Sequence, residues 1–327
     1  METVLVAGGA GYIGSHLCLA LAGRGITPVT LDNLSTGHQD AVRWGPLVTA
    51  NIADRQGVGA AIAAHKIRSC FHFAGLIAVG ESVAEPARYY ENNVSATIAF
   101  LQAALAAGIE RVIFSSTAAV YGNPEIVPIP ESHRTGPTSP YGHSKLMVEQ
   151  ILMDFAAAYG LSSVSLRYFN AAGADPGGAL GERHAPETHL IPLVLEAAVG
   201  KRSDIAIYGS DYETPDGTCI RDYIHVADLC DAHILALRWL EQQPKGTAAA
   251  FNLGNGPGYS VLEVVETARR VTQRPIAARV APPRAGDPAI LIAASKQAQT
   301  ILNWTPRFPA LETQIAHAWQ FLTQGPI

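Results

Sequence analysis

Cysteine is scarce in this chain of 327 residues, which contains only four. They are Cys18, Cys70, Cys219 and Cys230, and no two of them have the close spacing of a zinc-binding pair. We therefore interpret the four as reduced residues of the core, and we predict no metal site.

Charged residues are also few, and neither sign dominates. They make up 16% of the chain and give a formal net charge of −5, so the basic excess typical of nucleic-acid binding is missing. Hydrophobic residues make up 48%, which supplies a large core and argues against disorder. The composition indicates a folded protein with no nucleic-acid partner.

Long apolar segments are missing as well. No run reaches the about eighteen residues that a membrane-spanning helix needs. The first residues, METVLVAGGAGYIG, read as a strand that enters a turn, not as the charged segment and apolar core of a signal peptide. We expect a cytoplasmic protein with no membrane partner.

Short β-branched runs alternate with longer alanine- and leucine-rich stretches through the first half of the chain. This alternation predicts crossover units and an α/β fold with a doubly wound, Rossmann-like parallel sheet. The predicted strands are Thr3–Ala7, Pro28–Leu31, Leu47–Ala50, Cys70–Phe73, Val112–Ser115 and Ser163–Arg167, with helices at His16–Arg24 and Thr97–Ala107 between them.

The texture changes after Tyr168, where Gly, Pro, Asp and His mix over residues 171–188. Because the chain exceeds the size of a typical single domain, we predict two domains in close contact. Residues 1–170 form a dinucleotide-binding domain, to which segments near 226–250 return. Residues 171–327 form a smaller C-terminal α/β domain that binds the substrate.

A glycine-rich turn, Gly-Gly-Ala-Gly-Tyr-Ile-Gly at residues 8–14, directly follows the first predicted strand. Gly8, Gly11 and Gly14 allow a tight turn, close approach of the backbone to a pyrophosphate, and helix packing. Asp32 ends the second strand, where a carboxylate can bind a ribose 2′-hydroxyl and repel a 2′-phosphate. This context favours NAD as cofactor over NADP, and over a glycine turn without any ligand.

The stretch Ser-Pro-Tyr-Gly-His-Ser-Lys at residues 139–145 reads as the start of a helix, with Pro140 at its first position. Tyr141 and Lys145 then lie one turn apart on one face. A free phenol titrates near pH 10, and a neighbouring ammonium and a nicotinamide cation would both favour its ionised form. The pair is either an ordinary helix start or a catalytic base with its cationic neighbour.

The fifth strand ends in Phe-Ser-Ser-Thr-Ala-Ala-Val-Tyr-Gly, residues 114–122. This places Ser115, Ser116 and Thr117 at the carboxyl edge of the sheet, where ligands bind in open α/β folds. One of the three hydroxyls could hydrogen-bond a reacting sugar oxygen. A serine-rich strand end alone is more often a turn, but beside the tyrosine and lysine it indicates a proton relay.

Eight stretches carry a resemblance that covers nearly the whole chain. They are VAGGAGYIGSH, LDNLSTGH, FHFAGLIAVGES, YYENNV, FSSTAAVYG, SPYGHSKLMVEQ, LRYFNAAGA and IRDYIHVADL. With them the chain resembles the extended short-chain dehydrogenase/reductase family and, within it, the UDP-glucose (UDP-galactose) 4-epimerases. The glycine and Tyr-x-x-x-Lys motifs are shared by the superfamily, whereas DNLSTGH, AVGES, RYFNAAGA and RDYIHV are more particular to the epimerases.

The resemblance implies a reversible inversion at C4 of a UDP-hexose. Tyr141 takes the proton of the 4-hydroxyl with Thr117 as bridge, hydride passes to tightly bound NAD, and the 4-keto sugar turns over before hydride returns. Because the sugar must turn, binding energy should concentrate on the uridine diphosphate. The family is usually a homodimer, built from helices like those at 92–107 and 144–159.

Carried over position by position, the family's contacts fall into two sets. Catalysis falls to Tyr141, Lys145 and Thr117. The NAD set comprises Gly8, Gly11, Tyr12, Ile13, Gly14, Asp32, Asn33, Gly37, Asn51, Ile52, Phe73, Ala74, Asn92, Lys145 and Phe169. The UDP-hexose set comprises Thr117, Tyr141, Asn170, Leu190, Ala206, Ile207, Tyr208, Arg221, Arg284, Asp287 and Leu291.

Several positions depart from many relatives. Thr117 replaces a serine and keeps the hydroxyl, Asn51 replaces an aspartate near adenine, and Ile77 replaces a lysine near the cofactor phosphates. His189 replaces an asparagine near the substrate. Leu291 stands where a tyrosine excludes N-acetylated sugars, so we hypothesise that UDP-N-acetylglucosamine is partly accepted.

Other functions on the same scaffold have weaker support. A 4,6-dehydratase usually has Asp-Glu after the strand-five hydroxyl, where this chain has Ala118 and Ala119. We find no carboxylate-binding set for uronic acids, and a reductase that releases its cofactor fits the motif RYFNAAGA poorly. A non-catalytic NAD sensor would commonly lose the Tyr141–Lys145 pair.

Overall fold

The computed structural model describes residues 2–256, 258–284 and 287–325. Its main feature is a parallel sheet of seven strands in the order β11-β6-β5-β4-β1-β2-β3. The strands are β1 Thr3–Ala7, β2 Thr27–Asp32, β3 Leu47–Thr49, β4 Ser69–His72, β5 Arg111–Ser115, β6 Ser162–Arg167 and β11 Ala248–Asn252. The predicted fold class is confirmed, and all six predicted strands are present, β1 with the predicted ends and the other five with slightly different ones.

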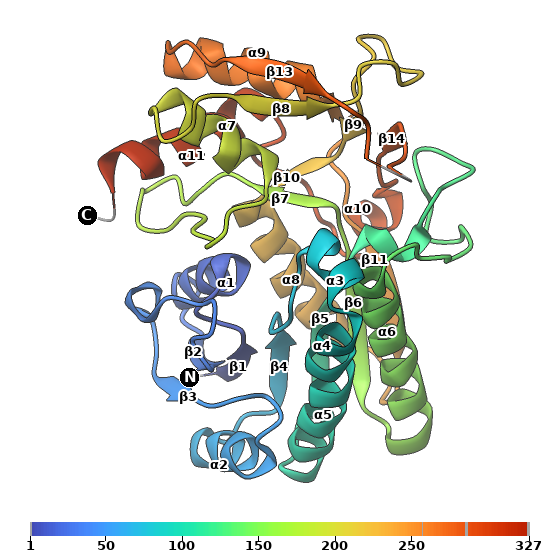
Figure 1. Cartoon of the computed structure of the whole chain (residues 1–327). Coiled ribbons are helices and arrows are strands. Elements are labelled where there is room, and N and C mark those ends of the chain that lie inside the picture. The colour runs from blue at the N-terminus through green and yellow to red at the C-terminus, as the bar shows by residue number, and fades with distance from the viewer. Residues whose placement is uncertain (1, 257, 285–286, 326–327) are drawn as a thin grey trace.

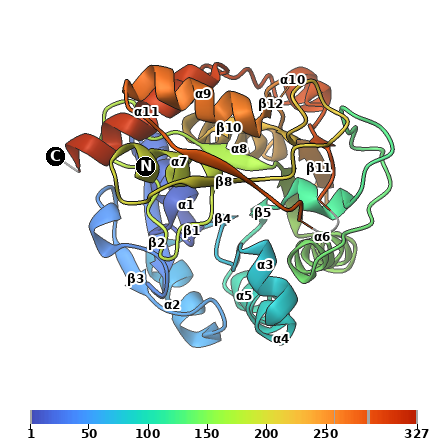
Figure 2. The same cartoon turned by 45° about the horizontal axis from the view of Figure 1, so that its top comes forward.

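Helices cover both faces of this sheet because strand residues alternate between two cores. Val4 and Val6 of β1 pack under α1 and α8, whereas Leu5 and Ala7 pack under α2, α5 and α6. Figures 1 and 2 show α5 and α6 on one side and α8 on the other. The bounds are α1 Tyr12–Ala22, α2 Arg55–His65, α3 Val79–Ala84, α4 Pro86–Tyr90, a π-helical turn Glu91–Ser95, α5 Ala96–Ala106, α6 Pro140–Tyr159 and α8 Val226–Leu240, with 3₁₀ turns at Gln39–Ala41 and Ala118–Tyr121.

The remaining elements lie above the arrowhead end of β4 in Figure 1. Helices α7, α9 and α11 share one core, which includes Ile191, Val264 and Ile315. The bounds are β7 Asn170–Ala172, α7 Leu190–Ala198, β8 Ile205–Tyr208, β9 Ile220–Arg221, β10 Tyr223–His225, β12 Tyr259–Ser260, α9 Val261–Thr272, β13 Ala278–Ala281, β14 Ile290–Leu291, α10 Lys296–Ile301 and α11 Leu311–Gln324.

The chain crosses between these two parts more than once. After β7 and β10 it returns through α8, which packs on α1, to β11, which pairs with β6. The division at residues 170/171 stays a prediction, and its end positions 1, 326 and 327 lie outside the described residues. Within the described residues, no helix is long and apolar enough to cross a membrane.

All four cysteines are buried and free, as predicted. Burial alone raises the pKa of the Cys70 thiol to about 12, so it stays protonated at neutral pH. These residues act as small core side chains.

Candidate active site

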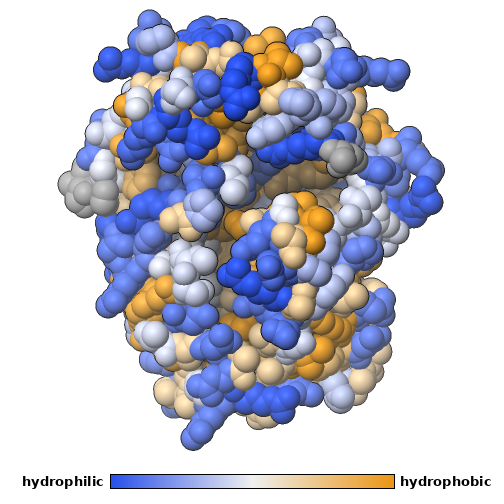
Figure 3. All heavy atoms as spheres, viewed as in Figure 1, coloured by the Kyte–Doolittle hydropathy of each residue, from blue (hydrophilic) through white to orange (hydrophobic). Residues whose placement is uncertain are grey.

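The strand order reverses between β1 and β4, because β2 and β3 lie on one side of β1 while β4, β5 and β6 lie on the other. In open α/β sheets, ligands bind outside the carboxyl ends of the strands at such a switch point. The surface is hollowed between the lower part of the molecule, which holds the sheet, and the upper part (Figure 3).

The glycine turn lies at this switch point, and Gly8 and Gly14 have no room for a side chain. Gly8 has a φ of +82°, and a Cβ there would lie 2.6 Å from the backbone nitrogen of Ala74. A Cβ on Gly14 would lie 2.1 Å from the carbonyl oxygen of Gly8. Gly11 is the N-cap of α1, and no side chain caps this helix. The N–H groups of the first helical turn therefore face the glycine turn without a side-chain partner. This cradle fits a dinucleotide pyrophosphate.

Asp32 ends β2 beside the turn and is only 8% exposed. Its Oδ2 accepts from the N–H of Ala10 at 3.0 Å, and its Oδ1 accepts from the N–H of Leu34 at 2.8 Å. The carboxylate therefore fixes the turn, and its remaining lone pairs can still accept hydrogen bonds from a ribose bound there. A Cβ on Gly37 would lie 3.1 Å from this Oδ1, so Gly37 keeps the approach open.

The other residues predicted to bind NAD lie in the first turn of α1, in the segments that follow β2, β3, β4 and β6, and in the π-helical turn. Ile52 is buried, whereas Asn51 is exposed and its Oδ1 accepts from the N–H of Ala53. Tyr12 reaches across and donates its hydroxyl to the carbonyl of Gly173 at 2.7 Å. The remaining positions are Ile13 in α1, Asn33 after β2, Phe73 and Ala74 after β4, Asn92 in the π-helical turn, and Phe169 after β6.

Helix α6 starts as predicted, with Pro140 at its first position and Ser139 as N-cap. The Ser139 hydroxyl accepts from the N–H of Gly142 at 3.2 Å. Tyr141 and Lys145 share one face, with the lysine Nζ 6.0 Å from the centroid of the tyrosine ring. Lys145 is 3% exposed and donates to the carbonyl oxygen of Ser115 at 2.9 Å.

The structure separates the three hydroxyls at the end of β5. Ser115 bonds with the Tyr168 hydroxyl at 2.5 Å, and Ser116 donates to the Glu149 carboxylate. The Thr117 hydroxyl accepts from the N–H of Ala119 at 3.1 Å, and it is the one of the three that lowers the pKa of Tyr141. The role of Thr117 as the bridge between the base and a sugar oxygen stays a prediction, which the partners of the two serines favour.

Burial works against the predicted ionisation of the tyrosine. It raises the pKa of Tyr141 to about 12, and the hydrogen bond with Thr117 lowers that pKa only in part. Burial also lowers the pKa of Lys145 to about 8, although the Glu149 carboxylate acts in the opposite direction and raises it. Lys145 is not among the groups that shift the pKa of Tyr141, and its ammonium donates to the Ser115 carbonyl. The combined effect of the ammonium and a nicotinamide cation on this phenol stays a prediction.

The residues predicted to bind the nucleotide sugar lie in the upper part, over the carboxyl edge. Arg221 and Asp287, predicted as separate ligand contacts, form an ion pair with 2.5 Å between Nη2 and Oδ1. The Arg284 guanidinium lies 4.2 Å above the centroid of the Tyr208 ring.

The remaining five predicted substrate residues lie on four elements. Asn170 begins β7 and donates its Nδ2–H to the carbonyl of Asp222 at 2.9 Å. Leu190 begins α7, and Ala206 and Ile207 lie in β8. Leu291, in β14, pairs with Arg221 of β9.

Asn93 has a positioning role that sequence reasoning missed. Its Oδ1 accepts from the N–H of Leu76 at 2.8 Å, and its Nδ2 donates to the carbonyl of Leu76 and to the Ser144 hydroxyl. It thus ties the loop after β4 to the residue before Lys145. The motif YYENNV contains it, but nothing in the sequence tells which of its two asparagines turns inward.

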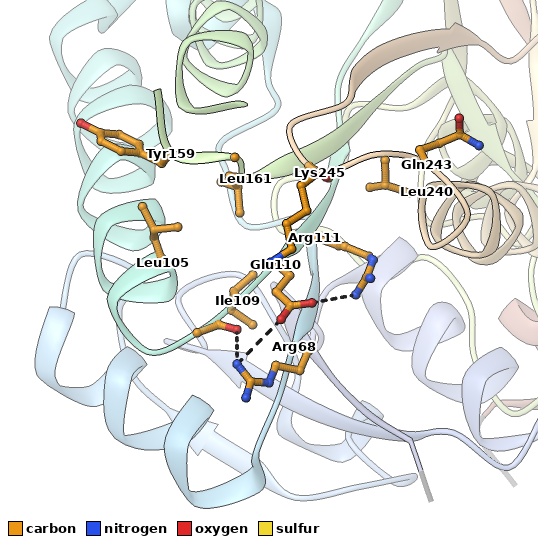
Figure 4. A pocket seen from close by; sticks show the side chains of 13 residues that line it. Arg68, Leu105, Ile109, Glu110, Arg111, Tyr159, Leu161, Leu240, Gln243 and Lys245 are labelled. Carbon is orange, nitrogen blue, oxygen red and sulfur yellow. Dashed lines mark hydrogen bonds and ion pairs between the residues drawn. The ribbon is translucent and has the colours of Figure 1, made fainter. Parts of the chain in front are cut away.

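A cavity of about 220 Å³ lies at the opposite, amino edge of the sheet (Figure 4). Arg68, Glu110 and Arg111 meet there, with Glu110 between the two arginines at 4.0 and 3.3 Å. It contains none of the predicted site residues, and ligands of this fold bind at the other edge. We therefore assign the chemistry to the carboxyl edge.

Together, the glycine turn at the switch point and the tyrosine–lysine pair on the adjacent edge define a dinucleotide-dependent enzyme of the short-chain dehydrogenase/reductase class. The comparisons with known proteins then narrow the class. A model of the NAD dependent epimerase/dehydratase family matches residues 4–254, and the chain belongs to this family.

Named relatives and solved structures are similar to this chain over nearly the whole length of both proteins. The UDP-glucose 4-epimerase of Halalkalibacterium halodurans is 51% identical over 99% of this chain and 96% of its own. The solved UDP-glucose 4-epimerase from Brucella ovis in complex with NAD is 48% identical, covers 98% of both chains and has a TM-score of 0.95. That from Bifidobacterium longum, in complex with NAD⁺ and UDP, is 37% identical over 99% of both chains with a TM-score of 0.93. The resemblance identified from the sequence is confirmed.

Proposed function

We propose that this chain is a UDP-glucose 4-epimerase that uses bound NAD as its cofactor. The observation that carries the proposal is the placement of Tyr141 and Lys145 on one face of α6, 6.0 Å apart from ring centroid to Nζ, at the edge that also holds Thr117 and the glycine turn. The full-length similarity to UDP-glucose 4-epimerases supports the choice of reaction. A 4,6-dehydratase is disfavoured because Ala118 and Ala119 follow Thr117.

The chain's own groups move the proton. Tyr141 accepts the proton of the sugar 4-hydroxyl and later returns it, and Thr117 donates a hydrogen bond that stabilises the phenolate. Bound NAD would supply the hydride acceptor for C4, and its positive ring would add the stabilisation that a phenol with a pKa raised to about 12 still needs. Lys145, fixed by the Ser115 carbonyl, adds positive charge beneath the site.

Inversion requires that the 4-keto sugar turn over while its nucleotide stays bound. Arg221 is suited to hold the diphosphate because a guanidinium matches two phosphate oxygens at once. To bind the diphosphate, Arg221 would have to give up part of its contact with Asp287, whose carboxylate could then accept from a hydroxyl of the ligand. We assign the grip on the nucleotide to the upper part of the molecule and leave the sugar loosely held.

A coupled assay tests this function. Purified protein supplied with UDP-galactose should form UDP-glucose, detected as NADH produced by added UDP-glucose dehydrogenase. UDP-galactose without the epimerase is the blank. Absence of turnover in protein shown to contain NAD would refute the proposed reaction.

Replacement of Asp32 should change cofactor binding more than the fold. In Asp32→Ala, the ribose and the N–H groups of Ala10 and Leu34 lose a charged acceptor, which is typically worth about 1.5–3 kcal/mol, so NAD should bind roughly 10- to 100-fold more weakly. Asp32→Asn keeps an acceptor and removes the charge, so it should bind NAD better than the alanine variant and admit NADP. Titration of both cofactors measures this, and unchanged discrimination in both variants would contradict the role.

The sugar range follows from Leu291, which packs against the small cluster of Ala118, Val120 and Tyr121 behind Thr117. We propose that this side chain leaves space for an N-acetyl group at C2. Leu291→Tyr should abolish turnover of UDP-N-acetylglucosamine and leave turnover of UDP-glucose within about tenfold. Parallel assays of both sugars check this, and a wild-type protein inactive on the acetylated sugar would refute the proposal.

A homodimer in the cytoplasm completes the proposal. The α6 side chains Met147 and Met153 are 44% and 49% exposed, as expected for a helix that packs against a second copy. Light scattering on the purified protein decides the oligomeric state, and a monomer at micromolar concentration would refute the dimer.

A further inference from the structure

Two glutamates and two histidines meet on the segment between β7 and α7, in the pattern Glu-x-His-x-x-Glu-x-His. They are Glu182, His184, Glu187 and His189, and their ligand atoms all lie within 4.8 Å of one another. We propose that this cluster is a binding site for one divalent transition-metal ion of the zinc type.

The separations match those of a metal's ligand shell. With bonds of about 2.0–2.1 Å, neighbouring ligands of a tetrahedral ion lie roughly 3.3 Å apart. His184 Nδ1 lies 3.2 Å from Glu182 Oε1 and 3.6 Å from Glu187 Oε2. His189 Nδ1 hydrogen-bonds Glu182 Oε1 and lies 3.9 Å from Glu187 Oε1. Small adjustments therefore suffice to centre an ion among the four side chains.

The burial and charge of the cluster call for a cation. The Glu182 and Glu187 side chains are only 6% and 7% exposed, and within the described residues their ion pairs involve the two histidines and no lysine or arginine. The arginine between them, Arg183, turns away to Asp40 at 2.9 Å. Two carboxylates out of water need compensation, and one divalent ion with two neutral imidazoles supplies it.

One atom of the cluster is unsatisfied. His184 Nδ1 is buried, and no atom of the described residues is aligned to hydrogen-bond it, although two carboxylates lie near. Once its proton is lost, a buried nitrogen close to two carboxylates is suited to bind a metal. Glu187 is already oriented, because its Oε1 accepts from the N–H groups of Thr188 and His189 at 2.7 and 2.9 Å.

Protons are the natural competitors for this cluster. Burial lowers the pKa of His184, but the neighbouring carboxylates raise it, to about 10. A metal must displace such protons, so its affinity should increase with pH.

The cluster lies where the upper part of the molecule meets the glycine turn of the lower part. The His184 ring is edge-on to Tyr12 with 6.4 Å between centroids, and the Arg183 carbonyl is bonded to His38 Nε2 at 3.0 Å. All four ligands come from one short segment, so a bound ion would fix that segment against the turn. This role differs from the proposed chemistry, which needs no metal.

Untagged protein, stripped with a chelator and desalted, is titrated with Zn²⁺ at pH 8 by calorimetry. We expect one ion per chain with a Kd of about 1 µM or tighter, and a melting temperature higher by a few degrees at saturation. Glu187→Gln and His184→Asn, which keep shape and hydrogen-bonding capacity, should each weaken Zn²⁺ by about 100-fold or more. His65→Asn, at the end of α2, is the matched control and should leave the affinity unchanged.

Wild-type protein decides the outcome even if a variant fails to fold. Absence of stoichiometric Zn²⁺ binding at pH 8 would overturn the proposal and leave a cluster of ion-paired histidines. Equal affinity in folded wild type and in both variants would place the ion elsewhere and would overturn it too. Epimerase activity is measured separately, so the proposed function stands or falls on its own.

Discussion

Replacing Tyr141 with phenylalanine should lower kcat for the epimerisation of UDP-galactose by roughly 10²- to 10⁴-fold. The change deletes only the hydroxyl, whose pKa Thr117 lowers, and leaves the ring in place. No other hydroxyl can easily replace it, because Ser115 and Ser116 are bonded to Tyr168 and Glu149. The coupled assay measures the loss, and since KM reports mainly the grip on the nucleotide it should change little.

The same helix offers a matched control for this variant. Tyr159 ends α6 with its side chain 61% exposed, so Tyr159→Phe makes the same chemical change away from the site and should leave kcat unchanged. NAD content, read from the absorbance of denatured protein, should be equal in both. If Tyr141→Phe kept more than a tenth of the wild-type rate, Tyr141 would not be the base.

Replacing Glu149 with leucine should lower the free energy of unfolding by about 3–5 kcal/mol. Glu149 and Arg167 form a buried ion pair whose side chains are 7% and 10% exposed, and Arg167 also donates to the hydroxyl of Tyr121 at 2.9 Å. Without the carboxylate, the guanidinium keeps its desolvation cost and loses its counter-charge. Urea unfolding monitored by circular dichroism measures the change.

Two further variants test whether the effect comes from burial. The exposed pair Arg134–Glu125, with side chains 73% and 67% exposed, should lose less than about 1 kcal/mol in Glu125→Ala. The double variant Glu149→Leu with Arg167→Met should be more stable than Glu149→Leu alone, since no charge is then left unpaired. A single variant as stable as the wild type would contradict the assigned role of the pair.

Much of the lower part of the molecule, which holds β1 to β6, could be predicted from the sequence because its signals are local. Short runs of β-branched and other apolar residues mark most of β1 to β6, and Gly8 in the glycine turn has a positive φ that few residues besides glycine adopt. Helix α6 was predictable from Ser139 and Pro140, which cap and start it.

Features that depend on long-range contacts were not predictable. Strand β11 reads Ala-Ala-Ala-Phe-Asn, a poor strand sequence, and becomes a strand because the edge of β6 accepts it. The Arg221–Asp287 pair joins residues far apart in sequence, and the raised pKa of Tyr141 reflects how deeply α6 is packed. The Glu182–His189 cluster depends on how one irregular segment folds, which no periodicity describes.

The position of β11 has a consequence for how the protein is made. When only the first 170 residues have left the ribosome, the chain carries six strands, and one edge of β6 has no neighbouring strand. Unpaired edges invite association with other chains, so the nascent protein stays exposed to it until residue 252 has left the ribosome. Synthesis of the segment between β6 and β11, which includes α7 and α8, is therefore a condition for covering the edge of β6.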